Sequence, residues 1–121
     1  MSATHYISNS TLSLEELNTI IEENHTLALS EEAIANINKC REYLDNKMQT
    51  ETNPIYGINT GFGSLYSVKI SNEDLTTLQE NLMKSHACGT GDEVPHSIVK
   101  IMLLLKIKSL CYGNSGVQLF T

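Results

Sequence analysis

Apolar residues recur at the spacing of an α-helix in four segments of the chain. The first segment follows a capping box, in which the Ser13 oxygen accepts a backbone N–H and Glu16 reaches back to the serine. This pattern predicts a short helix that ends at about Glu23, before Asn24. The residues that it is expected to bury are Leu14, Leu17, Ile20 and Ile21.

The second segment predicts a longer helix that begins at Ser30, with Glu31 and Glu32 favourably placed in its first turn. Pro54 pushes Asn53 out of helical geometry, so this helix is expected to fade before it reaches them. Its apolar positions are Ala33, Ile34, Ile37, Cys40, Tyr43, Leu44 and Met48.

Ser71 caps a third predicted helix, whose apolar stripe ends in a histidine. The stripe consists of Leu75, Leu78, Leu82 and His86. At about 100° per residue, His86 falls close to Leu82 and therefore lies on the apolar face. A lone histidine on such a face is more often a satisfied core residue than a functional one, and both interpretations stay open at this point.

The fourth segment starts near Pro95, which suits the first turn of a helix, and stops at Gly113. A helix this apolar around its circumference is typical of one that is covered on several sides. Its apolar residues are Ile98, Ile101, Met102, Leu104, Leu105, Leu110 and Cys111. Ser115 predicts the start of a further helix that carries Val117, Leu119 and Phe120. Because the chain stops within this apolar run, we expect it to be the N-terminal piece of a larger protein.

Two short segments, residues 5–7 and 26–29, are the candidates for β-structure. The second alternates weakly between polar and apolar positions, and we expect it to pair with the first as a two-stranded ribbon. The whole pattern therefore predicts a mainly α fold, with a short two-stranded β ribbon and a glycine-rich loop.

The glycine-rich loop lies within residues 54–70, and its centre reads Tyr56-Gly57-Ile58-Asn59-Thr60-Gly61-Phe62-Gly63. Glycine disfavours both helix and strand, but it permits sharp turns and close approach of the backbone to a neighbour. A phosphate-binding loop fits poorly, because Tyr66 stands where a G-x-G-x-x-G motif has its third glycine. From composition alone, a tight connection anchored by Tyr56 and Phe62 is the simpler interpretation.

Composition excludes several classes of function. The 121 residues include eight Lys/Arg and fourteen Asp/Glu, a net charge of −6, without a basic cluster for nucleic acid. Lysines at positions 100, 106 and 108 interrupt the apolar run that would otherwise suggest a membrane span, and no signal peptide precedes it. The three cysteines form no CxxC pair, so no metal site is predicted and reduced thiols in the cytoplasm are expected.

Three motifs, in order, resemble those of the aromatic amino acid ammonia-lyase family. The loop at 56–63 resembles the family's signature loop, residues 78–91 its second motif, and residues 102–117 its third. One departure is Lys100, where members of the family commonly have arginine. The resemblance implies that 1–121 is a single N-terminal fragment of a larger lyase, with 54–70 as the active-site loop and 94–113 as the start of a long helical core.

The resemblance also implies roles for individual residues. Tyr56 is expected to be the base that takes the β-proton of the substrate, for which it must act as a phenolate, and no obvious source of the necessary stabilisation is visible. His86 is expected to contact the substrate ring, which would give its position on the apolar face a function. The expected loop residues are Gly57, Asn59, Thr60, Gly61, Phe62 and Gly63.

The pair Ser85-His86 implies L-histidine as the substrate and urocanate as the product. A tyrosine or phenylalanine lyase, or an aminomutase of the same family, is the alternative. A small non-enzymatic helical interaction module is a third interpretation, which a stable monomer with a closed surface would favour.

The family's electrophile is methylidene-imidazolone, which forms from an internal Ala-Ser-Gly. That tripeptide is absent from this chain, and the nearest string is Asn114-Ser115-Gly116. The fragment alone is therefore expected to be inactive. The resemblance implies that the full-length protein is a homotetramer, and the apolar fourth helix predicts that the fragment self-associates.

Overall fold

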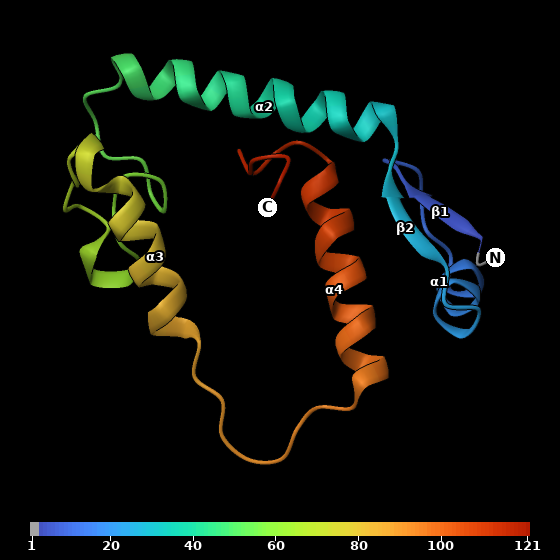
Figure 1. Ribbon diagram of the computed structural model, residues 1–121. Coiled ribbons are helices and arrows are strands. Elements are labelled where there is room, and N and C mark those ends of the chain that lie inside the picture. The colour runs from blue at the N-terminus through green and yellow to red at the C-terminus, as the bar shows by residue number, and fades with distance from the viewer. Residues whose placement is uncertain (1–2) are drawn as a thin grey trace. The chain divides into compact units, whose positions relative to one another are not determined.

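The computed structural model describes residues 3–121, which form two strands and four α-helices (Figure 1). In chain order these are β1 (Thr4–Ile7), α1 (Leu14–Glu22), β2 (Thr26–Leu29), α2 (Glu31–Thr50), α3 (Leu75–His86) and α4 (His96–Cys111). Short 3-10 turns occur at Gly63–Leu65 and Asn72–Asp74. The chain divides into two units, one made of Met1–Thr50 with Glu93–Thr121 and the other of Glu51–Asp92. The mainly α fold with a two-stranded sheet, predicted from the sequence, is confirmed.

The two strands of the first unit pair in parallel. Thr4 lies opposite Thr26 and Ile7 opposite Leu29. The pairing is parallel because α1 crosses between the strands and brings the chain back to its starting end. The predicted ribbon is therefore a β-α-β unit, and the N–H of Ser30 extends its contacts by donating to the Ile7 carbonyl at 2.9 Å.

The capping box at the start of α1 is confirmed. The Ser13 hydroxyl accepts the Glu16 N–H at 3.1 Å, and the Glu16 carboxylate accepts the Ser13 N–H at 2.9 Å. The expected burial of Leu14 was wrong, since 80% of this residue is exposed, whereas Ile20 is buried. The helical pattern gives a residue's angle around the helix, but Leu14 occupies the first position, and no neighbour extends over it.

The core of the first unit joins the β-α-β unit, α2 and α4. Its buried residues are Ile7, Ile20, Ala33, Ile37, Leu104 and Cys111. Gly113 follows α4 with φ of +70°, and a Cβ there would lie 2.6 Å from the Asn36 carbonyl oxygen in α2. Only glycine permits both this backbone angle and this approach. At the other edge, the Lys108 ammonium donates to the Ser8 carbonyl at 3.0 Å and also to that of Ser10.

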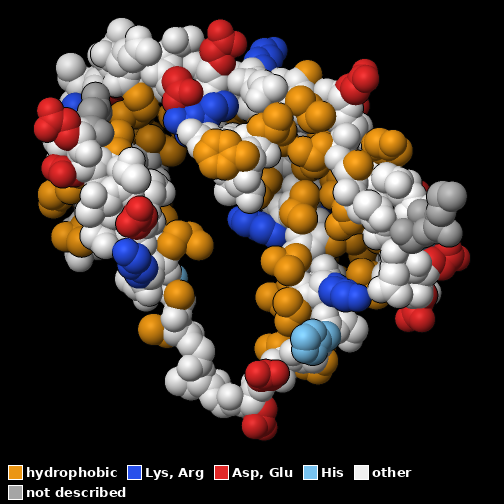
Figure 2. Space-filling view, in the orientation of Figure 1, with side chains coloured by type: hydrophobic (Ala, Val, Ile, Leu, Met, Phe, Trp, Pro, Cys, Tyr) orange, Lys and Arg blue, Asp and Glu red, His pale blue; other side chains and the backbone are white. Residues whose placement is uncertain are grey.

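Most apolar side chains of α4 stay uncovered within the described chain. Leu104 and Cys111 are its buried residues. Hydrophobic side chains gather along α4 in Figure 2. The exposed apolar residues of this helix include Ile98, Val99, Met102, Leu103 and Leu105. None of the helices in residues 3–121 combines the length and hydrophobicity that a bilayer crossing needs. The sequence pattern predicted that other elements cover α4 on several sides, but within the described chain they cover it on one side.

The helix expected from Ser115 was wrong, because the residues after α4 form turns and irregular structure. Gly116 has φ of +70°, which a right-handed helix excludes. Its carbonyl accepts a hydrogen bond from Arg41 Nη1 at 3.2 Å, and Val117 packs against the core. Contacts with α2, which the local sequence does not reveal, override the serine cap.

Candidate active site

The glycine-rich loop of the second unit begins with a tight turn. The N–H groups of Ile58 and Asn59 both donate to the Ile55 carbonyl, at 3.1 and 3.2 Å. Gly57 adopts φ of +70°, and a Cβ at this position would lie 2.9 Å from Cε1 of Phe62. Glycine at this position therefore serves two purposes: it permits the backbone angle and leaves room for the Phe62 ring.

Two fully buried polar residues hold the loop from inside. Asn59 and Thr60 both have 0% exposure. The Asn59 amide oxygen accepts the Ile55 N–H at 2.7 Å, and its nitrogen donates to the Asn53 carbonyl at 3.4 Å. The Thr60 hydroxyl accepts the Gly57 N–H at 3.3 Å and donates to the carbonyl of the next residue at 3.0 Å. These two loop residues of the sequence motif shape the backbone and leave its aromatic side chains to face outward.

Contacts from Lys69, near the end of the loop segment, and from α3 fix the centre of the loop further, through residues that sequence reasoning missed. The Lys69 ammonium donates to the Thr52 carbonyl at 2.9 Å, and Lys69 forms an isolated antiparallel bridge with Thr60. From α3, the Gln79 side-chain amide donates to the carbonyls of Gly57 and Ile58, at 3.4 and 3.3 Å. Gln79 itself is exposed, so the apolar periodicity of α3 gave no signal for this contact.

The ring of Phe62 lies between those of Tyr56 and His86. The Tyr56 and Phe62 centroids are 5.5 Å apart, with the planes tilted by 50°. The His86 imidazole approaches Phe62 edge-on, with 5.9 Å between centroids and 78° between planes. The structure thus brings the two residues singled out as base and substrate contact against one aromatic ring, although they are separated by a loop and a helix.

All three rings of this aromatic row are accessible. Tyr56 is 62% and Phe62 43% exposed, and His86 is exposed at the end of α3. In the described part of the chain, the Tyr56 hydroxyl makes no hydrogen bond to another residue. The half-buried stripe of α3 stops at Leu82, so His86 is not the satisfied core residue that its spacing first suggested.

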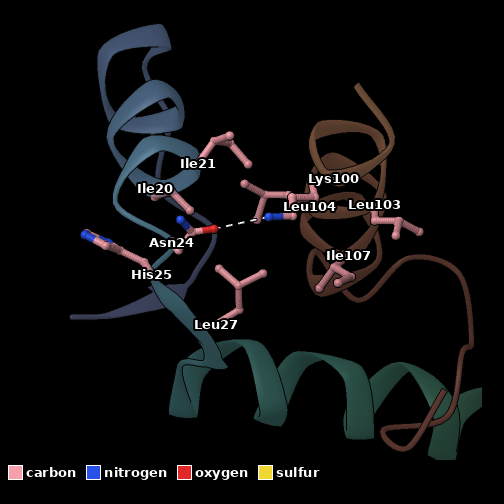
Figure 3. A pocket seen from close by; sticks show the side chains of 9 residues that line it. All are labelled: Ile20, Ile21, Asn24, His25, Leu27, Lys100, Leu103, Leu104 and Ile107. Atoms are coloured by element: carbon pink, nitrogen blue, oxygen red, sulfur yellow. Dashed lines mark hydrogen bonds between the residues drawn. The ribbon is translucent and has the colours of Figure 1, made fainter. Parts of the chain in front are cut away.

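A separate groove lies in the first unit and includes none of these residues. Its volume is about 350 Å³, and apolar side chains of α1 and β2 line one side of it, opposite Leu104 of α4 (Figure 3). Lys100, the position that departs from the family's usual arginine, donates from this groove to the Asn24 side-chain oxygen at 3.1 Å. Within residues 3–121, no three His, Cys, Asp or Glu side chains are grouped to hold a metal ion.

Relatives in sequence cover almost the whole chain. Histidine ammonia-lyase from Clostridium tetani is 42% identical over 110 residues, which are 91% of this chain and 21% of the relative. The enzyme of the same name from Legionella pneumophila is 44% identical over 108 residues, 89% of this chain and 21% of the relative. The chain therefore spans about a fifth of the length of the curated relatives it matches.

Solved structures agree with the sequence relatives. Histidine ammonia-lyase from Trypanosoma cruzi superposes with a TM-score of 0.82 at 31% identity, over 97% of this chain and 23% of that one. Tyrosine aminomutase from Streptomyces globisporus gives 0.85 at 26% identity, over 97% and 22%. The model of the aromatic amino acid lyase family matches residues 12–121. The chain therefore belongs to the aromatic amino acid lyase family.

Proposed function

We propose that this chain is the N-terminal part of a histidine ammonia-lyase, which eliminates ammonia from L-histidine and releases urocanate. The observation that carries the proposal is the aromatic row of Tyr56, Phe62 and His86, which lies on the family's signature loop and second motif. The curated relatives named above carry the same enzyme name at 42% and 44% identity. We place the protein in the cytoplasm, where its free cysteines would stay reduced.

In this proposal Tyr56 is the base. Its exposed hydroxyl accepts the β-proton, and the contact with Phe62 limits where the phenol can lie. His86 contacts the imidazole ring of the substrate from the far side of Phe62. Loop residues Asn59 and Thr60 act indirectly, since their buried hydrogen bonds hold the backbone on which Tyr56 is mounted.

The family's electrophile does not fit the residues of this chain. Methylidene-imidazolone forms from Ala-Ser-Gly, and the nearest string here has Asn114 in place of alanine. The Ser115 hydroxyl accepts the Val117 N–H at 3.4 Å in a turn of the first unit. In the family this group supplies the electron sink for the elimination. We therefore expect the isolated chain, incubated with histidine, to give no urocanate absorbance above a blank, and clear turnover by purified chain would overturn this view.

The complete gene product tests the proposed reaction. We expect urocanate from L-histidine, whereas cinnamate or coumarate from phenylalanine or tyrosine, or a β-amino acid, would favour the other members of the family. Tyr56→Phe should lower kcat by about 10²–10⁴-fold while histidine still binds, because only the proton acceptor is lost. Tyr66→Phe is the matched control, since Tyr66 is also 62% exposed on the same loop. If Tyr56→Phe kept the wild-type kcat, Tyr56 would not be the base and would only anchor the loop.

We also propose that copies of the isolated chain associate through residues 95–121. Phe120 is 86% exposed, and residues 100, 103, 104 and 107 line one side of the groove of about 350 Å³ in the same unit. Each large apolar side chain left in water forgoes roughly 1.5–3 kcal/mol. In the complete protein, the same surface would be covered by the rest of the chain and by other subunits of a homotetramer.

Sedimentation velocity at micromolar concentration tests this association. We expect a dimer or larger species that Phe120→Asp or Leu103→Lys weakens. Leu14→Asp is the control, because Leu14 is 80% exposed but lies outside residues 95–121. A compact monomer that binds no hydrophobic dye would contradict the proposal and would favour a self-contained module.

A further inference from the structure

The turn that carries Tyr56 is held by α3 as well as by its own residues. From inside the turn, the Thr60 hydroxyl accepts the Gly57 N–H at 3.3 Å. From outside, the Gln79 side-chain amide donates to the carbonyl oxygens of Gly57 and Ile58, at 3.4 and 3.3 Å. In the described part of the chain, both hydrogen bonds that join α3 to this turn therefore come from one side chain.

The two carbonyl oxygens require a residue that donates twice. A carbonyl oxygen accepts hydrogen bonds and never donates them, so the nitrogen of the Gln79 amide, with its two N–H groups, must face the turn. The Lys69 and Lys108 ammonium groups serve pairs of backbone carbonyls in the same way elsewhere in the chain. A glutamate of the same shape, when ionised, offers acceptors only, and a methionine of similar length offers no donor. The contact therefore depends on the amide group and not on the size of the side chain.

The position of Tyr56 depends on this backbone. Its side chain is 62% exposed and lies against the Phe62 ring, and within the described residues its hydroxyl makes no hydrogen bond. The Gly57 carbonyl is one residue away, so a shift of the turn moves the phenol with it. We propose that Gln79 is the positioning residue of Tyr56, because it fastens the backbone next to the phenol to α3. The consequence for turnover rests on the proposed function, in which Tyr56 is the base.

The contact can be measured on the chain itself, independently of any activity. Gln79 is exposed, and methionine, lysine and glutamate favour helix as well as glutamine does, so substitutions at this position should leave α3 intact. In Gln79→Met, the carbonyl ¹³C resonances of Gly57 and Ile58 should move upfield, because each oxygen loses its donor. The ring resonances of Tyr56 should shift with them. Gln79→Lys keeps a donor and should stay close to the parent chain.

Gln49→Met is the matched control for these resonances. Gln49 is exposed near the end of α2, in the other unit, so its replacement should leave the carbonyl and ring resonances of the turn in place. Unchanged carbonyl resonances in Gln79→Met would show that the amide does not bond the turn in solution. Equal shifts in Gln79→Met and Gln79→Lys would show that donation is not what matters. Either result would overturn the inference.

The complete protein tests whether the contact positions Tyr56 for the reaction. Gln79→Met should lower kcat by about 10–100-fold with little change in KM, because a base displaced by about 1 Å reacts slowly on a substrate that still binds. Gln79→Glu should lower kcat further, since its carboxylate repels both carbonyl oxygens, and Gln79→Lys should recover most of the loss. Parent kcat in Gln79→Met, or a loss that lysine does not recover, would overturn the positioning role. If tyrosine or phenylalanine is converted instead of histidine, the proposed substrate fails, and the same comparison on that substrate still decides the role of Gln79.

Discussion

The ring of Phe62 meets the imidazole of His86 edge-on, with 5.9 Å between the centroids. Phe62 also contacts Tyr56, so one side chain touches both residues to which the proposed chemistry belongs. Edge-to-face contacts of this kind contribute about 0.5–1.5 kcal/mol beyond the area they bury. The loop therefore does more than support Tyr56, because it also orients the end of α3.

Replacement of Phe62 by leucine should release the His86 ring. Leucine keeps the apolar character but has no ring current, so the ring-proton resonances of His86 should shift in the spectrum of the chain. Phe120→Leu is the control, because Phe120 is 86% exposed in the other unit and should leave those resonances in place. Unchanged His86 resonances in Phe62→Leu would mean that the two rings do not pack in solution.

Gly57→Ala should destabilise the loop. An L-residue at φ of +70° costs about 1–2 kcal/mol, and the new Cβ would also press on Phe62, 2.9 Å away. Gly89→Ala is the matched control, because nothing lies within 4 Å of a Cβ there and its φ is ordinary. Urea unfolding should separate the two variants, and equal midpoints would argue against the turn at Gly57.

Asn59→Ala should destabilise the loop, although the asparagine that it removes is a buried polar residue. The substitution leaves the Ile55 N–H inside the loop without its 2.7 Å partner, a loss of about 1–3 kcal/mol. Limited proteolysis should then cut the loop faster than in the parent chain. Asn53→Ala removes an exposed side-chain contact to Glu51 and serves as the comparison. Equal cleavage rates in the two variants would show that Asn59 does not hold the loop closed.

The three thiols should react in order of accessibility, with Cys88 first, Cys40 second and Cys111 last. Burial raises the pKa of the Cys111 thiol, and the nearby Lys108 opposes this shift only in part. Timed alkylation followed by peptide mass analysis measures the order. Fast labelling of Cys111 in the native chain would contradict its place in the core.

The same raised pKa predicts a loss of stability at alkaline pH. The protonated Cys111 thiol is favoured in the folded chain, so its contribution is fully present below the pKa of the unfolded thiol. That contribution is lost as the pH rises through the higher pKa of the folded state. Cys111→Ala should flatten the alkaline part of the stability curve, and Cys88→Ala should not.

The helices could be predicted from the sequence because their signals are local. Ser13 caps α1 as expected, and α2 ends at Thr50, short of Pro54. Ser71 caps the 3-10 turn that leads into α3 rather than α3 itself, whose N-cap is Asp74. Leu14 and the segment after Ser115 were predicted wrongly, because their outcome depends on what a distant element covers or binds. No local pattern indicates that Arg41 will hold the Gly116 carbonyl.

For the candidate site, the motifs identified Tyr56, His86 and the loop between them. They could not indicate that Phe62 would lie between the two, since that contact is set by the turn at Gly57 and the length of α3. The hydrogen bonds from Asn59 and Gln79 to the loop backbone could not be predicted either. Bonds between a side chain and a distant backbone group leave no periodic pattern in the sequence. The roles of Tyr56 and His86 in catalysis stay predictions.

The first unit is made of two segments of the chain that the ribosome synthesises at different times, with the second unit between them. Its core draws Ile7, Ile20, Ala33 and Ile37 from the start of the chain and Leu104 and Cys111 from after the inserted unit. The Lys108 ammonium and the Ser8 carbonyl, which form a hydrogen bond in this unit, belong to residues that are 100 positions apart. At roughly 5–20 residues per second, translation delivers Cys111 on the order of 5–20 seconds after Ile7. Throughout that interval the nascent chain exposes four of the six core residues without the other two, so this stretch is where a chaperone has both the surface and the time to bind.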